Sequence, residues 1–166
     1  EHIVNGAFWN MGENCSAISR LIVHKDIKSE LLKKIVDRLR DWKTGDPLDP
    51  QNHLGALIDK EHCIKVSRYL SEGAVIGGKI DGNFVTPTIY ETTTDDKKAR
   101  DEIFGPILSV LEVQTNEEAI SIANKTEYGL TASIFSANTR NALRAARELR
   151  AGTVTVNSYG EGDITT

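Results

Sequence analysis

Cysteine is scarce in this sequence, with only Cys15 and Cys63 among 166 residues. Two cysteines are too few for the disulfide framework of a small secreted domain. They form no Cys-x-x-Cys pair, and the four histidines show no zinc-ligand spacing. No apolar run approaches the roughly 18 residues that a membrane-crossing helix needs, and no signal-peptide pattern is present. We therefore expect no disulfide, no metal site and no membrane partner.

Basic charge is also lacking. The 24 acidic residues outnumber the 20 basic ones, which gives a net charge of −4, and no basic block occurs. This balance argues against a nucleic-acid partner. The hydrophobic content of 39% can fill the core of one domain. Because the sequence begins at Glu1 without an initiator methionine and stops at "EGDITT" without a terminating signal, we interpret it as a piece of a longer, cytoplasmic protein.

Hydrophobic periodicity predicts helices that alternate with strands. Helices are expected at 2–12, 27–43, 60–74, 95–106, 116–125 and 138–152, and strands at 19–24, 84–91, 107–113, 130–136 and 153–157. Pro87 favours an edge position for the second of these strands. Asn116 is the expected N-cap of its helix, and Gly152 the expected C-cap of the last one. The alternation predicts an α/β fold, a mostly parallel twisted sheet with helices on both faces.

The stretch "GENCSAIS" places Cys15 between a glycine-led turn and a run of small residues. Taken alone, it leaves Cys15 equally open as a buried thiol and as a nucleophile. Cys63 shares one helical face with Val66 and Leu70, so we expect it in the core. The glycine-rich stretch 73–82 has neither dinucleotide-binding nor phosphate-loop spacing and precedes a strand. It predicts a turn, and no nucleotide-binding domain is visible in these residues.

Four motifs in a fixed order carry a resemblance to a known family. They are "GENC" at 12–15, "DEIFGP" at 101–106, Asn124 followed by "YGL" at 128–130, and "AGTVTVN" at 151–157. In this order, they resemble the catalytic domain of the NAD(P)-dependent aldehyde dehydrogenase family over the whole of residues 1–166.

The resemblance implies oxidation of an aldehyde to a carboxylic acid by covalent catalysis. A cysteine thiolate adds to the aldehyde, hydride passes to NAD or NADP, and the resulting thioester is hydrolysed. By this resemblance Cys15 is the nucleophile, and its own N–H is half of an oxyanion hole. Glu102 corresponds to a residue that binds the nicotinamide ribose, and Phe104 to one that packs against the ribose and nicotinamide. Leu130 corresponds to a residue near the nicotinamide pocket, whereas Tyr128 and Asn157 are expected to support loops.

Residues 1–166 also depart from the family pattern. Many members carry glutamine where this chain has Glu13, which changes the polarity of the loop. The family's general-base glutamate, its oxyanion asparagine, the dinucleotide-binding domain and the oligomerisation strands are expected outside these residues. The resemblance implies that the cofactor is bound mainly by the upstream domain, and that the full-length enzyme is a homodimer or homotetramer.

The substrate and two other functions stay open. Glu161 and Asp163 flank Gly162 in a region that resembles the substrate entrance of ω-aminoaldehyde dehydrogenases of polyamine breakdown, including the γ-glutamyl-aminobutyraldehyde type. Two carboxylates there would favour a cationic substrate tail, although an ordinary acidic turn explains them equally well. An acylating, coenzyme A-dependent dehydrogenase and a non-catalytic assembly domain remain alternatives. No histidine stands in a recognisable partner motif, which disfavours a cysteine hydrolase.

Overall fold

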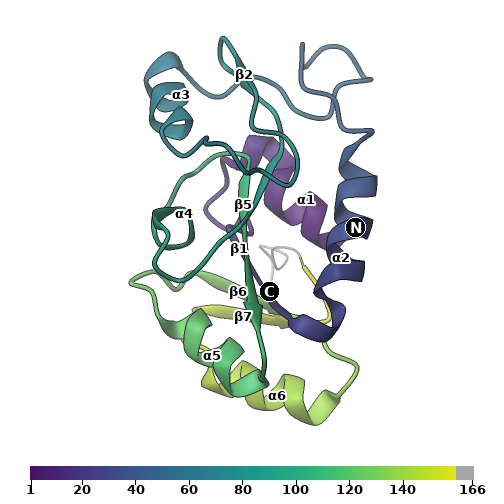
Figure 1. Ribbon diagram of the computed structural model, residues 1–166, viewed down its shortest axis with the longest axis vertical. Helices are drawn as coiled ribbons and strands as arrows, with labels where there is room; N and C mark the ends of the chain where they lie inside the picture. The colour runs from purple at the N-terminus through teal and green to yellow at the C-terminus, as the bar shows by residue number, and fades with distance from the viewer. Residues whose placement is uncertain (160–166) are drawn as a thin grey trace, which may run out of the picture.

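The computed structural model describes residues 1–159 (Figure 1). Its helices are α1 (His2–Phe8), the 3-10 helix η1 (Trp9–Gly12), α2 (Lys25–Leu39), α3 (Lys60–Ser67), α4 (Lys97–Arg100), α5 (Asn116–Asn124) and α6 (Thr139–Glu148). Its strands are β1 (Arg20–His24), β2 (Ile80–Asp81), β3 (Phe84–Val85), β4 (Thr88–Glu91), β5 (Ile107–Val113), β6 (Thr131–Ile134) and β7 (Thr153–Val156). No helix in this part of the chain is long and apolar enough to span a membrane.

A parallel three-stranded sheet, in the order β1-β5-β4, forms the centre of the molecule. In its register Ile22 lies opposite Leu111 on one side of β5, and Tyr90 lies opposite Ser109 on the other. Glu112 is the only exposed residue of β5, as expected for a parallel strand covered on both faces. Pro87 immediately precedes β4, one of the two edge strands of this sheet, which confirms the edge position predicted for this segment.

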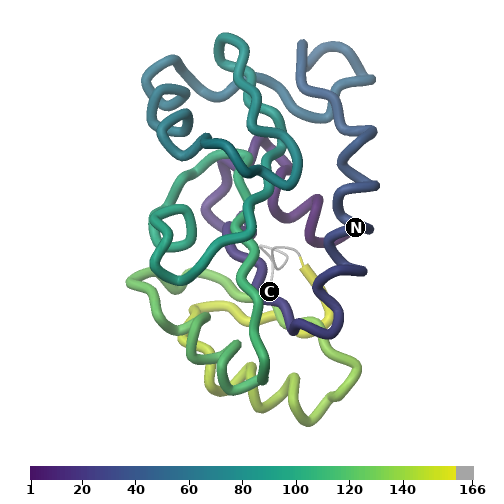
Figure 2. Tube along the Cα trace, viewed as in Figure 1, coloured from purple at the N-terminus to yellow at the C-terminus, as the bar shows by residue number. Residues whose placement is uncertain are grey.

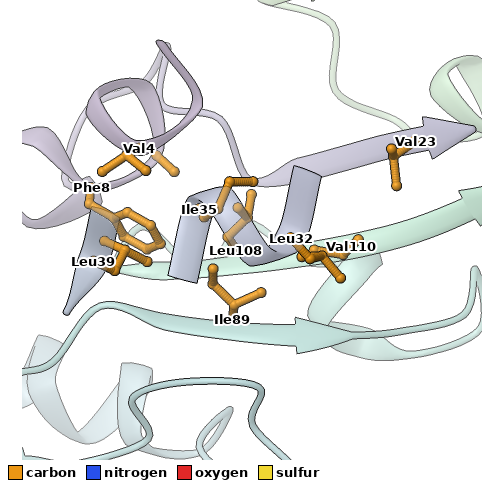
Figure 3. Packing of buried hydrophobic residues seen from close by; sticks show 10 residues of the cluster. Val4, Phe8, Val23, Leu32, Ile35, Leu39, Ile89, Leu108 and Val110 are labelled. Carbon is orange, nitrogen blue, oxygen red and sulfur yellow. The ribbon is translucent and has the colours of Figure 1, made fainter. Parts of the chain in front are cut away.

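The sheet has helices on both faces, as predicted. On one face Phe8 of α1 and Ile35 and Leu39 of α2 pack against Ile89 and Leu108 of the strands (Figure 3). Phe8 is fully buried, and burial of such a side chain stabilises the fold by about 1.5–3 kcal/mol. α2 and α1 therefore anchor β1, the strand that follows the loop of Cys15.

The opposite face is covered by α3 and the segments around it. This second core contains Leu57, Cys63, Val66, Val85, Tyr90, Ile103 and Ile107. Cys63 is 3% exposed, and its thiol lies 3.2 Å from the carbonyl oxygen of Gly82. The predicted core position of Cys63 is thus confirmed.

The remaining strands form two smaller sheets within residues 1–159. β6 and β7 pair in parallel, and α5 and α6 run side by side next to them, as the Cα trace in Figure 2 shows. The predicted turn at 73–82 contains β2, which forms a short antiparallel hairpin with β3. The parallel α/β class is therefore confirmed, but the parallel strands are divided between a three-stranded and a two-stranded sheet.

Several helix ends differ from the prediction. α3 ends at Ser67 rather than near residue 74, and α1 ends at Phe8. The N-cap of α5 is Thr115, whose hydroxyl accepts the Glu118 N–H at 3.1 Å, so the prediction of Asn116 was wrong by one residue.

The predicted C-cap at Gly152 was also wrong, because α6 ends at Glu148. The Asn124 amide accounts for this end. Its Nδ2 donates to the Glu148 carbonyl, and its Oδ1 accepts the Arg150 N–H, each at 2.8 Å. A side chain from α5 thus satisfies polar groups that a glycine cap would otherwise serve.

Candidate active site

The loop that carries Cys15 begins with three residues in the left-handed region. Asn10, Met11 and Gly12 have φ angles of 51°, 57° and 70°. These angles lie within η1 and produce a kink directly after α1. Left-handed φ angles raise the backbone energy of residues that carry a side chain. Two such residues in succession, Asn10 and Met11, therefore indicate a loop whose conformation is held by its surroundings.

Asn14 fixes the next part of this loop. Its Oδ1 accepts hydrogen bonds from both the N–H and the hydroxyl of Ser16, each at 3.1 Å. Its carbonyl accepts the Ala17 N–H at 3.0 Å. These bonds close a tight turn around Cys15 and leave the thiol at the surface. The Cys15 Sγ lies 3.7 Å from the Asn14 Oδ1, and no acceptor within residues 1–159 takes the Cys15 N–H.

A second loop, 101–106, lies beside the first. It follows α4 and contains Phe104, whose φ of 59° is again left-handed. The neighbouring Gly105 packs on α3, because a Cβ at that position would approach the Val66 side chain to 2.8 Å. This packing fixes the turn, yet Phe104 keeps 36% of its surface exposed. Glu102 is exposed, and no residue of 1–159 forms a hydrogen bond or ion pair with its carboxylate.

One open cleft of about 580 Å³ brings these residues together. Cys15, Glu102, Phe104 and Leu130 all line it, as does Tyr128. The cleft runs along the free side of β1 and reaches the segment that leads into β6. Four of the six residues predicted for the site therefore share one cleft. The other two, Glu161 and Asp163, lie outside the described residues.

The cleft wall includes exposed apolar side chains. Leu130 is 54% exposed and Tyr128 is 47% exposed, in addition to Phe104. Large apolar side chains exposed along a cleft are typical of a surface that binds another group. Tyr128 was expected only to support a loop, and the structure places it on the cleft wall as well.

Asn157 has the supporting position that the sequence predicted. Its Oδ1 accepts the Ser136 N–H at 2.8 Å, and its Nδ2 donates to the Ser136 carbonyl at 3.1 Å. This two-point contact ties the end of β7 to the end of β6. Asn157 itself has a φ of 53°, which its side-chain contacts stabilise.

The sequence did not predict a side-chain contact that joins the two loops through α3. The His62 Nε2 of α3 lies 3.4 Å from the Glu13 carboxylate and 2.6 Å from the Phe104 carbonyl oxygen. The only hint of this contact in the sequence was the acidic residue at position 13, where many members of the family that the sequence resembles carry glutamine. Within residues 1–159, no group of three or more His, Cys, Asp or Glu residues could hold a metal ion.

Comparison with known proteins defines the class to which this fold and cleft belong. Residues 1–166 match the model of the aldehyde dehydrogenase family throughout, and the chain belongs to this family. It is 51% identical to aminoacetaldehyde dehydrogenase from Pseudomonas aeruginosa, over all of this chain and 35% of that protein.

Two solved structures are similar in sequence and fold. One is γ-glutamyl-γ-aminobutyraldehyde dehydrogenase from Burkholderia cenocepacia, with 43% identity and a TM-score of 0.92 over 97% of this chain and 35% of that one. The other is an indole-3-acetaldehyde dehydrogenase in complex with NAD+, with 43% identity and a TM-score of 0.94 over 99% and 36% of the two chains. The chain thus spans about a third of the length of these relatives.

Proposed function

We propose that the protein containing this chain is an NAD+-dependent aldehyde dehydrogenase, and that residues 1–166 supply its nucleophile, Cys15. The observation that carries this proposal is the shared cleft. An exposed thiol, a carboxylate without a partner among residues 1–159 and an exposed aromatic ring line the same surface. A merely structural cysteine would be buried, as Cys63 is.

The first step is addition of the Cys15 thiolate to the carbonyl carbon of the aldehyde. A C–S bond forms, and the carbonyl π electrons move to oxygen to give a thiohemiacetal oxyanion. The Cys15 N–H, which has no acceptor within residues 1–159, can donate to this oxyanion and so stabilise the charge that develops. Collapse of the oxyanion expels hydride from the same carbon and leaves a thioester on Sγ. Water then cleaves the C–S bond, which releases the carboxylic acid and the thiol.

The cleft residues fit a nicotinamide cofactor. NAD+, when bound, would supply the oxidant, because its nicotinamide ring takes up the hydride, the hydrogen together with its two bonding electrons. The exposed ring of Phe104 and the Leu130 side chain offer an apolar wall to a flat ring, and the Glu102 carboxylate can accept hydrogen bonds from ribose hydroxyls. We propose NAD+ as the cofactor because the similar indole-3-acetaldehyde dehydrogenase was solved with NAD+.

We further propose that residues 1–166 are one part of the catalytic domain. The dinucleotide-binding domain, the general base and the oligomerisation strands would then belong to the rest of the protein. The length of the relatives supports this division, since this chain spans about a third of them. Assembly into a homodimer or homotetramer is part of the same proposal, and light scattering on the full-length protein tests it.

We propose an aminoaldehyde as the substrate. Two relatives are named for substrates of this class, aminoacetaldehyde and γ-glutamyl-γ-aminobutyraldehyde. In this chain, the carboxylates of Glu161 and Asp163 could attract a cationic tail, with each close pair contributing about 1 kcal/mol.

The experiment is a comparison of kcat/KM for 4-aminobutanal and uncharged pentanal in the full-length enzyme. The double variant Glu161→Gln, Asp163→Asn should remove most of any preference for the cation, while Cys15→Ser should abolish oxidation of both. If the double variant has the same ratio of kcat/KM for the two aldehydes as the parent, Glu161 and Asp163 do not select the substrate. If coenzyme A is required and an acyl-coenzyme A is formed, the enzyme is of the acylating type instead.

A further inference from the structure

Two contacts join the loop that carries Cys15 to the turn that contains Phe104. In the first, the backbone of Gly12 lies against the carbonyl of Gly105, with no room for a side chain. The second runs through His62, whose ring nitrogen Nε2 reaches both Glu13 and Phe104. Segments from three distant parts of the sequence therefore meet at one imidazole.

The geometry fixes where the imidazole carries its proton. Nε2 faces the Phe104 carbonyl oxygen at 2.6 Å and a Glu13 carboxylate oxygen at 3.4 Å. Both partners are acceptors, so Nε2 must be the donor. The Glu13 and His62 side chains are only 9% and 15% exposed, and the same Glu13 oxygen accepts the Ile58 N–H at 3.1 Å. Little water competes for this contact, which makes it well defined.

Phe104 needs such a donor because its backbone is strained. Its φ of 59° is unfavourable for an aromatic residue and persists only where neighbours hold it. The hydrogen bond from His62 holds its carbonyl, and the two rings meet edge to face with centroids 6.2 Å apart. Val66, one turn further along α3, packs on Gly105. One helix thus fixes both residues of the turn.

We propose that His62 is a positioning residue. It fixes the position of Phe104 relative to Cys15 and so shapes the part of the cleft where the cofactor would bind. This inference rests on the proposed function. Without the donor, the Phe104 backbone relaxes from its left-handed angle and its ring moves away from the apolar wall. Cofactor binding then weakens, whereas the Cys15 turn, which Asn14 holds independently, keeps its shape.

The test uses the full-length protein with His62→Ala, His62→Gln and the control His53→Ala. A glutamine amide keeps a donor that can reach the Phe104 carbonyl. His53 stacks on Trp42, with ring centroids 5.1 Å apart, and does not line the cleft. The measurements are the NAD+ dissociation constant by titration, the KM values for NAD+ and aldehyde, and the alkylation rate of Cys15.

His62→Ala should raise the NAD+ dissociation constant and KM about tenfold, the effect of one lost hydrogen bond at a strained site. The KM for aldehyde and the alkylation rate of Cys15 should stay within about twofold, because they do not depend on Phe104. His62→Gln should restore NAD+ binding to within about twofold of the parent, and His53→Ala should not change it.

Unchanged NAD+ binding in His62→Ala would overturn the proposal, as would a His62→Gln variant as weak as His62→Ala. If His62→Ala does not fold, His62→Phe gives the same test, since it keeps a ring on α3 but has no N–H to donate to the Phe104 carbonyl. A parent enzyme that binds NAD+ but forms no NADH would contradict the proposed function alone, because the titration needs no turnover. A parent that does not bind NAD+ would overturn both.

Discussion

Gly12 and Gly105 lie in direct backbone contact, although the two glycines belong to different motifs far apart in the sequence. A Cβ on Gly12 would approach the Gly105 carbonyl oxygen to 2.5 Å, and Gly12 has a φ of +70°. This contact brings the loop of Cys15 against the turn of Phe104. The two motifs therefore lie against each other along one cleft, and the spacing between them depends on the absence of side chains at their junction.

Gly12→Ala should accordingly destabilise the protein and reduce its activity. The substitution adds both a left-handed strain and a backbone clash, so we expect a loss of more than about 2 kcal/mol in the free energy of unfolding. Gly82→Ala is the matched control, because Gly82 also has a positive φ but nothing lies within 4 Å of its Cβ position. The Gly82→Ala substitution should lower the free energy of unfolding by only about 1 kcal/mol. Urea denaturation of both variants measures the difference, and equal losses would show that the Gly105 contact is unimportant.

Alkylation should distinguish the two cysteines. Cys15 is exposed, whereas Cys63 is buried and burial raises the pKa of its thiol. Because the thiolate is the reactive form, Cys63 has both less access and a smaller reactive fraction at neutral pH. Iodoacetamide should modify Cys15 at least about tenfold faster in the folded protein. Peptide mapping by mass spectrometry measures both rates, and in denaturant the difference should disappear. Faster labelling of Cys63 in the folded protein would contradict the assignment of Cys15.

Residues 1–166 produced alone should not form NADH from an aldehyde. The cleft residues Glu102 and Phe104 offer only one wall to a cofactor, and hydride transfer requires the cofactor to be held in place. The absence of a general base typically lowers the reaction rate by a further factor of about 10²–10⁴. Absorbance at the NADH band measures turnover, with circular dichroism as the control for folding. Clear turnover by the folded piece would mean that residues 1–166 bind the cofactor productively without the rest of the protein, which contradicts this prediction.

Lys28 should make a contribution to stability that disappears in acid. Its Nζ lies 2.6 Å from Glu91 and 2.7 Å from Glu112, so it ties α2 to both β4 and β5. The hydrogen bond from Lys28 holds the pKa of the Glu112 carboxyl below its usual value. A depressed carboxyl pKa stabilises the fold above the unfolded value of about 4.3, and this stabilisation is lost as the pH falls through the folded value.

Lys28→Met should therefore lower the melting temperature at pH 7, and the difference from the parent should shrink at pH 3. The control is Lys34→Met, which removes an exposed pair with Glu30 within α2 alone. Lys34 also lowers the pKa of Glu30, but these side chains are 71% and 73% exposed, so solvent screens the pair and this control should melt closer to the parent at both pH values. Calorimetry measures the melting temperatures, and a Lys28→Met difference that persists at pH 3 would show that packing rather than charge is responsible.

The sequence determined the order and type of the main elements and the identity of the candidate nucleophile. The apolar run of β5 predicted a covered central strand, and Pro87 predicted the edge. These features depend on local patterning, which any stretch of chain carries by itself. Family motifs further predicted Cys15, Glu102, Phe104 and Leu130, which the fold brings to one cleft.

Only the tertiary structure decided the features that depend on distant partners. The end of α6 is set by Asn124 of another helix, and the left-handed angle of Phe104 is held by His62. The acidic residue at position 13 does not by itself identify His62 as its partner, because this pairing arises from the packing of α3 against two loops. A pattern within one segment reports what that segment prefers, whereas these contacts exist only when separate segments are packed together.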